Sequence, residues 1–284
     1  MELLQLTYFC TAAELESFSK TAEKYSVPPS SISQSINRLE KELSTKLFDR
    51  TPNRITLNAF GKCFYENTKA ALTLLNDAKL KLSDKDEISG EIKILVETNR
   101  RIVTKAIELF MSKYKNVSFF INNSYEENTN EYDLIITDRK IYDSSLSKEK
   151  IVVDDILLAF QRNNPLSRLD KITIKDLENE KFITMGSKTG IFGITNEICS
   201  EAGFLPNIVI QSDDPYYIRK YIEMGLGISF IPSVSWQGLF SENVVCRKIM
   251  DRKRYTYAYF HSNRYITKAV RNFLDVLISL NKGV

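Results

Sequence analysis

Apolar residues recur at helical spacing in the first third of the chain. Ile32, Ile36, Leu39 and Leu43 follow one another at steps of four, three and four, which predicts one buried stripe along a helix. Pro29 suits the first helical position because its missing N–H is not needed there. The helix is therefore predicted to begin near residue 29.

Two shorter helices are predicted upstream of this helix, and a two-stranded wing is predicted downstream. Ser19 is a suitable N-cap for the second helix, which buries Ala22 and Tyr25. The first helix carries a buried stripe made of Leu3, Leu6, Cys10 and Ala13. The wing consists of residues 47–50, a turn at 51–53 and a strand at 54–57. Three small helices would then share one core.

The polar face of the helix that begins near residue 29 is rich in hydrogen-bond donors for base edges and phosphates. Its members are Ser30, Ser33, Gln34, Asn37 and Lys41, with Ser31 and Arg38 at its margins. Two short helices joined by a tight turn form the geometry that places one helix in a DNA groove. Arg50 and Arg54 of the wing would lie beside this helix and meet phosphates or a minor groove. The alternative is a small helical domain with a solvated polar face.

A longer helix is predicted from residue 58 to about residue 83. Its apolar and small residues alternate steps of four and three, a 3.5-residue repeat that favours pairing with a partner helix. The seam consists of Phe64, Thr68, Ala71, Leu75, Ala78 and Leu82. The alternative is a helix that packs against its own domain.

Beyond a polar hinge at residues 83–90, strands and helices alternate, which predicts an open and mostly parallel sheet. The first set is strand 91–96, helix 102–111, strand 117–121 and strand 132–136. The second set is strand 151–158, strand 181–184, helix 190–202, strand 207–210, helix 215–224 and strand 227–231. Two similar α/β lobes would face one another. Between Val117 and Asp133 too few residues remain for a full crossover helix.

Ligands of open α/β sheets bind beyond the carboxyl ends of the strands, and between two lobes those ends converge on one cleft. Hydroxyls, amides and a cation follow the predicted strands and suit a carboxylate or another small anion. We expect the cleft to use Thr98, Asn99, Ser124, Ser187, Lys188, Thr189, Gln211 and Ser212. Taken one by one, these are also the residues that ordinary turns and caps require.

Composition narrows the classes of function. The 284 residues are 43% hydrophobic, enough for two or three packed domains, and no signal peptide or membrane span is visible, so we expect a cytoplasmic protein. The net charge is only +3, but between Lys20 and Lys62 eight basic residues stand against four acidic ones. Four scattered cysteines and one histidine predict reduced thiols, no metal site, no cofactor and no acid–base catalysis.

Residues 1–61 resemble the N-terminal DNA-binding domain of the LysR-type transcriptional regulators. The matching positions are Phe9, Ser17-Phe18, Ala22, Val27, Ile32-Ser33, Leu39-Glu40, Leu47-Phe48, Arg50, Leu57 and Gly61. The chain departs from the family pattern at Thr21, at Pro28-Pro29 and at Asn58. In the family the position of Pro29 usually holds a glutamine that contacts DNA, and proline has no side-chain donor or acceptor for that contact.

The resemblance implies an N-terminal winged helix-turn-helix, a linker helix that pairs two subunits, and a C-terminal two-lobed α/β effector domain like the periplasmic solute-binding proteins. The implied domains are residues 1–58, 59–88 and 89–284, with lobe I at about 91–160 and 263–284 and lobe II at about 161–262. The chain would cross between the lobes near residues 160 and 263, and helix 266–281 would close lobe I.

The function implied is that of a sequence-specific transcriptional regulator. As a homodimer or homotetramer it would bind inverted repeats in double-stranded DNA, under the control of a small-molecule effector in the interlobe cleft. Two alternatives remain open at this point. A solute-binding protein without a regulatory role leaves the N-terminal third without a function. A metabolic enzyme needs an acid–base pair or nucleophile that is not visible.

Overall fold

The computed structural model describes residues 1–51, 54–84, 88–125 and 129–281. The chain divides into two compact units, of which the first ends at Lys85 and the second begins at Asp86. Each unit has its own hydrophobic core, and each is therefore described by itself. Within the described residues, no helix combines the length and the apolar character that crossing a membrane requires.

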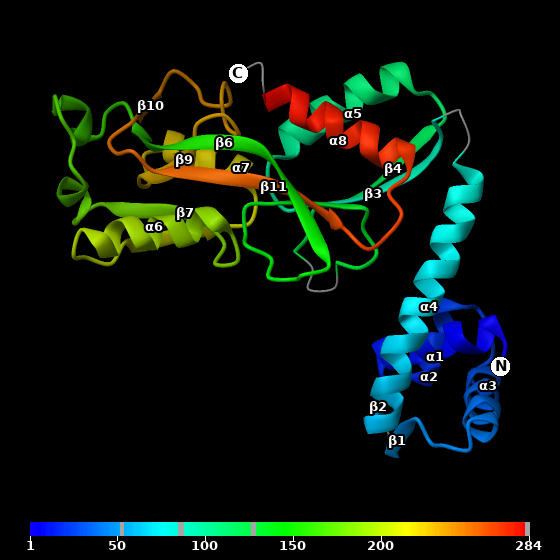
Figure 1. The fold of residues 1–284 in the computed structure, drawn as a ribbon. Helices are drawn as coiled ribbons and strands as arrows, with labels where there is room; N and C mark the ends of the chain where they lie inside the picture. Colours follow the sequence, from blue (N-terminus) through cyan, green and yellow to red (C-terminus); the bar gives the residue numbers. More distant parts are fainter. Residues whose placement is uncertain (52–53, 85–87, 126–128, 282–284) are drawn as a thin grey trace. The chain divides into compact units, whose positions relative to one another are not determined.

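The first unit packs three short helices, a β-hairpin and the start of a long helix around one core (Figure 1). Its elements are α1 (Leu3–Leu15), α2 (Phe18–Lys24), α3 (Pro29–Glu42), β1 (Phe48–Thr51), β2 (Arg54–Leu57) and α4 (Ala59–Ser83). Phe9, Ile32, Ile36 and Leu39 are completely buried at its centre. The helix predicted to begin near residue 29 begins at Pro29, and the predicted helical core is confirmed. The turn residues 52–53 lie outside the described part of the chain.

Two local predictions for this unit are wrong. Ser17, and not Ser19, is the N-cap of α2, because its Oγ accepts a hydrogen bond from the Lys20 N–H at 3.2 Å. In α1 the buried residues form a continuous run from Tyr8 to Ala12, whereas the predicted stripe residue Leu3 is 46% exposed. The reason is that α1 contacts α2, α3 and α4, so it is covered on several sides and a single apolar stripe does not describe it.

The second unit is an α/β domain built on a seven-stranded sheet and a separate two-stranded sheet. Its first strands and helices are β3 (Gly90–Val96), α5 (Arg100–Lys113), β4 (Val117–Asn122), β5 (Leu134–Thr137) and β6 (Leu146–Gln161). Two short 3₁₀ turns follow at Pro165–Arg168 and Ile174–Leu177. The remaining elements are β7 (Lys181–Met185), α6 (Gly190–Glu201), β8 (Asn207–Ser212), α7 (Pro215–Glu223), β9 (Ser229–Pro232), β10 (Val244–Arg247), β11 (Lys253–His261) and α8 (Lys268–Asn281).

The long strand β6 belongs to both lobes of this unit, as Figure 1 shows. Its first part pairs with β11, and β5, β3 and β4 follow β11 in the same sheet. This part of the sheet and the helices α5 and α8 that cover it form lobe I. Its last part pairs with β9 and β10, which belong to lobe II together with β7, β8, α6 and α7. The strands β3, β4 and β5 are parallel to one another, as the alternating pattern predicts. The expectation of a mostly parallel sheet is nevertheless wrong for the seven-stranded sheet, because β6 pairs antiparallel with β9, β10 and β11, and β11 pairs antiparallel with β5.

The two crossings between the lobes lie earlier in the chain than the sequence suggests. Asp155 of β6 pairs with Lys253 in lobe I, and Ile156 pairs with Pro232 in lobe II, so the first crossing falls there and not near residue 160. All of β11 pairs with β6 in lobe I, so the return precedes Lys253 and does not lie near residue 263. The first crossing runs inside the continuous strand β6, where no turn residue marks it, and the second lies in residues 248–252, between β10 and β11.

The crossover from β4 to β5 contains no helix in its described residues, 123–125 and 129–133. This agrees with the prediction that the interval between Val117 and Asp133 is too short for one. Tyr132, Ile135 and Tyr259 instead form a small separate core with Leu95 on the face of the lobe I sheet that turns away from α5 and α8.

Candidate functional sites

The outward face of α3 exposes a continuous row of hydrogen-bonding side chains. Ser30, Ser31, Gln34 and Arg38 are exposed, while Ser33 and Asn37 are half-buried at the edge of the row. The opposite face of the same helix is fully buried, so the helix cannot rotate to hide these groups. The predicted polar face is thus presented to solvent on a rigidly packed helix.

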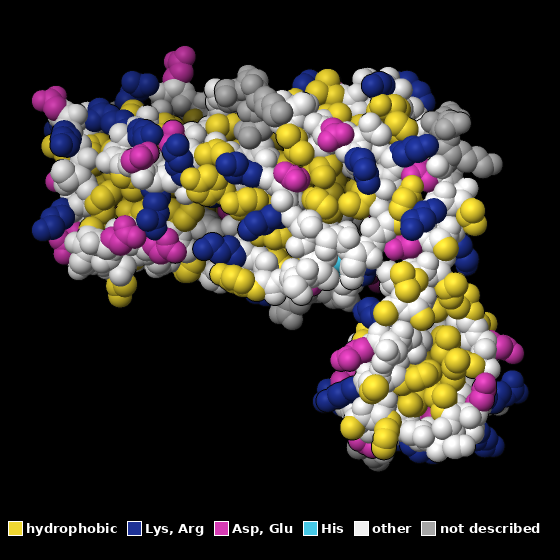
Figure 2. All heavy atoms as spheres, in the orientation of Figure 1, with side chains coloured by type: hydrophobic (Ala, Val, Ile, Leu, Met, Phe, Trp, Pro, Cys, Tyr) yellow, Lys and Arg dark blue, Asp and Glu magenta, His cyan; other side chains and the backbone are white. Residues whose placement is uncertain are grey.

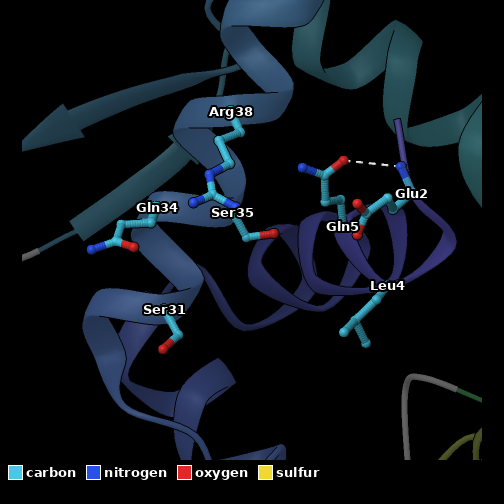
Figure 3. Close-up of a pocket in the computed structure, with 7 residues that line it drawn as sticks. All are labelled: Glu2, Leu4, Gln5, Ser31, Gln34, Ser35 and Arg38. Carbon is cyan, nitrogen blue, oxygen red and sulfur yellow. Dashed lines mark hydrogen bonds between the residues drawn. The ribbon is translucent and has the colours of Figure 1, made fainter.

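A shallow pocket of about 200 Å³ lies between α3 and the start of α1 (Figure 3). Ser31, Gln34 and Arg38 reach it from α3, and Gln5 reaches it from α1. Gln5 is itself fixed, because its Oε1 accepts a hydrogen bond from the Glu2 N–H at 2.9 Å. The start of α1 therefore borders the predicted DNA-binding face, which the sequence pattern did not indicate.

The wing is attached to α3 through Arg50. Its Nη2 donates to Asn37 Oδ1 at 2.9 Å and to Glu40 Oε2 at 3.1 Å, and its guanidinium lies 5.3 Å from the centre of the Phe18 ring. Arg50 therefore lies beside α3, as predicted. Arg54 instead forms an ion pair with Glu16, which directly follows α1.

Glu40 is the buried acceptor that joins α3 to the wing, and sequence reasoning missed this role. Its Oε1 accepts the Leu47 N–H at 3.0 Å and its Oε2 accepts Lys46 Nζ at 2.8 Å. Burial raises the pKa of Glu40, but the hydrogen bonds from Lys46 and from the Leu47 N–H, together with the charge of Arg50, outweigh it and hold the pKa below its ordinary value. Glu40 is therefore ionised at neutral pH.

Gly61, one of the positions that match the family pattern, lies very close to the backbone of Leu47. A Cβ at this residue would lie 2.0 Å from the carbonyl oxygen of Leu47, which is backbone that cannot move aside. Only glycine permits this approach of α4 to the chain that enters the wing. Leu39, Glu40, Leu47 and Gly61 thus belong to one packed junction of α3, β1 and α4.

The predicted seam of α4 divides into two halves. Phe64 packs in the core of the first unit, with its ring centre 5.2 Å from that of Phe9, and Thr68 is buried. Leu75 and Leu82 further along are 50% and 81% exposed, and Leu74 is 66% exposed. The helix therefore packs against its own domain at its start and presents apolar side chains at its end. Figure 2 shows apolar side chains gathered on the visible face of this unit.

A cavity of about 710 Å³ lies between the two lobes of the second unit. Of the eight residues predicted to line it, six do so: Thr98, Asn99, Ser124, Ser187, Lys188 and Thr189. Gln211 and Ser212 do not. They are the last residues of β8, where Ser212 Oγ accepts the Asp214 N–H at 3.2 Å, and the residues that follow them, Asp213 and Asp214, form the wall.

The floor of this cleft is a buried polar network around Arg254, which the sequence pattern did not reveal. Its Nη2 donates to Asp154 Oδ2 at 2.9 Å and to Ser235 Oγ at 2.7 Å, and its Nη1 donates to Thr98 Oγ1 at 3.3 Å. Ser235 Oγ also contacts Asn99 Oδ1. Asn99 and Thr98 are therefore held by protein groups in addition to facing the cavity. No periodic signal distinguishes Arg254 within the alternating residues of its strand.

Aromatic side chains line the cleft alongside the polar ones. The Tyr125 ring centre lies 4.3 Å from Lys188 Nζ and 4.9 Å from the guanidinium carbon of Arg139, so the ring contacts cations from both lobes. Trp236 borders the same cavity, with the Arg219 guanidinium 5.7 Å from its ring. The cleft thus combines apolar surface with a few convergent polar groups, which is typical of small-molecule sites.

Comparison with known families finds two matches along the chain. Residues 3–62 match the family described as bacterial regulatory helix-turn-helix protein, lysR family, and residues 85–281 match the LysR substrate binding domain. The chain belongs to the LysR family of transcriptional regulators. It is therefore a DNA-binding transcriptional regulator with an effector-binding domain, and not an enzyme. The solute-binding alternative fails because it leaves the matched N-terminal domain unexplained.

Relatives and solved structures span nearly the whole regulator. The chain is 28% identical over 242 residues to the transcriptional dual regulator GltC of Bacillus subtilis, covering 82% of this chain and 81% of that protein. It is 26% identical over 262 residues to the regulator AlsR of the same organism, covering 88% and 86%. The crystal structure of HinK, a LysR family regulator from Pseudomonas aeruginosa, has the same fold with a TM-score of 0.60 at 20% identity, covering 98% of both chains.

Proposed function

We propose that this LysR-family regulator reads specific DNA sequences with the exposed row of α3 and changes its DNA binding when a small molecule enters the cleft between lobes I and II. The observation that carries the proposal is the exposure of Ser30, Ser31, Gln34 and Arg38 on a helix whose other face is fully buried. Such a helix can enter the major groove without rearrangement of its core. A cytoplasmic location stays a prediction.

The roles within the row differ in chemistry. Gln34 is exposed at the middle of α3, and an amide there suits a bidentate contact with a base edge. Arg38 is a long exposed cation one turn later and suits a phosphate or a guanine. Arg50 is restrained by Asn37 and Glu40, so its remaining donors extend the row onto the wing. Ser30, Ser31 and Ser33 at the start of the helix add phosphate or base contacts.

Pairing of two chains through the second half of α4 is part of the proposal. Leu74, Leu75 and Leu82 are apolar and exposed, so a partner helix would bury surface that one chain leaves in water. Two DNA-binding domains held in this way read an inverted repeat, whose half-site spacing follows from the geometry of the pair.

DNA reading is tested with the full chain and the DNA upstream of its own coding region, by fluorescence anisotropy at several salt concentrations. Gln34→Ala is expected to cost about 1–3 kcal/mol on the specific site and less on unrelated DNA. Arg38→Ala is expected to weaken binding and, if it contacts a phosphate, to lower the salt slope by about 1. Arg271→Ala, an exposed arginine of α8, is the matched control. Wild-type affinity in both Gln34→Ala and Arg38→Ala would show that α3 is not the reading helix.

Pairing is tested by sedimentation. Leu75→Glu places a charge among the exposed leucines of α4 and is expected to shift the protein toward monomer, whereas Asn76→Glu adds the same charge at the neighbouring exposed position and is expected to leave assembly unchanged. Equal behaviour of the two variants would contradict pairing through this half of α4.

The effector part is tested with Ser187→Ala. Ser187 lines the cleft from the loop before α6, so its loss is expected to reduce the response to a ligand while DNA affinity without ligand stays near normal. A variant that unfolds would instead identify Ser187 as structural, and circular dichroism distinguishes the two outcomes.

A further inference from the structure

Asp138 places a carboxylate in the cleft at a position where a ligand anion would be expected. It directly follows β5 in lobe I, and its side chain is only 9% exposed. Its Oδ2 accepts a hydrogen bond from Arg254 Nη1 at 3.2 Å. Arg254 is 6% exposed, and its Nε is buried without a hydrogen-bond partner among the described residues. The guanidinium thus keeps one buried donor, Nε, from which no group of the described residues accepts a hydrogen bond.

The same carboxylate lies against the first turn of α6 in lobe II. A Cβ built on Gly190, the first residue of α6, would lie 2.5 Å from Asp138 Oδ2 and 2.9 Å from Oδ1. No side chain fits between the two, so Gly190 is what allows the contact. A helix N-terminus carries partial positive charge, which stabilises a carboxylate placed there.

We infer that the carboxylate of Asp138 acts as an internal ligand. It occupies the space between the first turn of α6 and the Arg254 guanidinium, which we call the anion position. The inference rests on the proposed function, since it concerns the same cleft. The external ligand for this position is a small carboxylate or another oxyanion of similar size, and it binds by displacing Asp138. An anion that meets α6 and Arg254 replaces the favourable contacts that Asp138 gives up.

The exchange links ligand binding to the lobes. Asp138 directly follows β5 of lobe I and Arg254 belongs to β11 of lobe I, whereas α6 belongs to lobe II, so the carboxylate of Asp138 lies at a contact between the lobes. A ligand differs from Asp138 because it is not tethered to β5. Displacement of Asp138 therefore releases the contact between lobe I and α6, and the spacing of the lobes is no longer held by that contact. A ligand that binds better at one spacing than at the other then acts as a switch.

The primary test measures binding of sulfate to the full chain. Trp236 is the one tryptophan of the sequence and lines the cleft, so its fluorescence reports on the cavity, and isothermal titration calorimetry follows the same titration independently. Asp138→Asn keeps the shape of the side chain and removes its charge. Because a hydrogen bond to a charged group contributes about 1.5–3 kcal/mol, we expect sulfate to bind roughly 10- to 100-fold more tightly to Asp138→Asn than to the wild type.

Asp213→Asn is the matched control. It removes one negative charge from the wall of the same cavity, and Asp213 is not the carboxylate that meets Gly190 or Arg254. Affinities for wild type and Asp138→Asn that agree within twofold would overturn the inference. An equal gain in Asp213→Asn would also overturn it, because the effect would then be the general charge of the cleft. DNA binding is not used in this readout, so failure of the DNA proposal and failure of this one are seen separately.

A double-substitution cycle tests the contact itself. Gly190→Ala is expected to lower the melting temperature in the wild type, where its Cβ meets the carboxylate, and to raise it in the Asp138→Ala background, where the space is open and alanine is the better helix former. Gly193→Ala is the control within the same helix, because its added Cβ meets no atom within 4 Å. Additive effects of Gly190→Ala and Asp138→Ala would show that the two residues are not in contact.

Discussion

Replacing Glu40 by glutamine isolates the charge that joins the DNA-reading helix to the wing. The side chain of Glu40 is 1% exposed and accepts hydrogen bonds from the backbone of Leu47 and from the side chains of Lys46 and Arg50. Glutamine has nearly the same shape, so it fills the same space. It offers one acceptor oxygen in place of two and carries no charge.

The expected cost follows from these contacts. The ion pair with Lys46 counts for little, because the lysine side chain is 70% exposed. The main loss is the charge-assisted bond from Arg50 and the weaker acceptor for the Leu47 N–H, which together give about 2 kcal/mol. A loss of this size raises the constant for local opening about thirtyfold.

Hydrogen–deuterium exchange of the peptide that contains Leu47 and Phe48 measures this opening directly in the full chain. The matched control is Glu42→Gln, two residues further along the same helix, where the carboxylate pairs with the exposed N-terminal amine of Met1. We expect fast exchange in Glu40→Gln and near wild-type exchange in Glu42→Gln. Equal exchange in the two variants would refute the role given to Glu40.

Three further outcomes are expected. The pKa of Glu40 is lowered in the folded protein, so its stabilisation is complete at neutral pH and is lost as the pH falls below its ordinary value of 4.5; exchange of the same peptide against pH checks this. Gly61→Ala places a Cβ 2.0 Å from the carbonyl oxygen of Leu47, so it should prevent folding of the first unit and abolish DNA binding. Its control, Gly193→Ala, should be neutral in thermal unfolding or stabilising by up to about 1 kcal/mol. Burial and the charge of Arg264 lower the pKa of His261 to about 4, so the second unit should lose about 2 kcal/mol between pH 7 and pH 5, and His261→Asn should flatten this dependence in calorimetry.

Local periodicity was sufficient to predict the elements that carry the function. The spacing of Ile32, Ile36 and Leu39 identified the buried side of α3, and once that side is known the opposite row is known as well. The alternation of strands and helices after residue 90 predicted the parallel strands β3, β4 and β5, but it did not predict that the other strands of this sheet pair antiparallel. Six of the eight residues predicted to line the cleft do line it, because they follow strand ends and parallel strands end at one edge of a sheet.

Some predictions that rest on local patterns in the sequence were wrong. Gln211 and Ser212 follow a strand as the rule requires, but the turn after β8 places the next residues in the wall instead. The first crossing between the lobes was misplaced because it lies inside β6, where no turn marks it. Ser19 was wrongly predicted as the N-cap of α2. Ser17 and Ser19 are both serines, and only the start of the helix at Phe18 shows that Ser17 is the cap.

By itself, then, the amino-acid order determined which sides of the helices and strands are buried. The reason is that the buried positions of a helix or strand repeat every few residues, so the pattern can be seen within a short segment. Only the tertiary structure decided which partners meet across the chain: Glu40 with the start of the wing, Gly61 with Leu47, and Asp138 with an arginine 116 residues away. Such contacts depend on how separate elements approach one another. That approach is set by the packing of the whole core and leaves no repeating signal in the sequence.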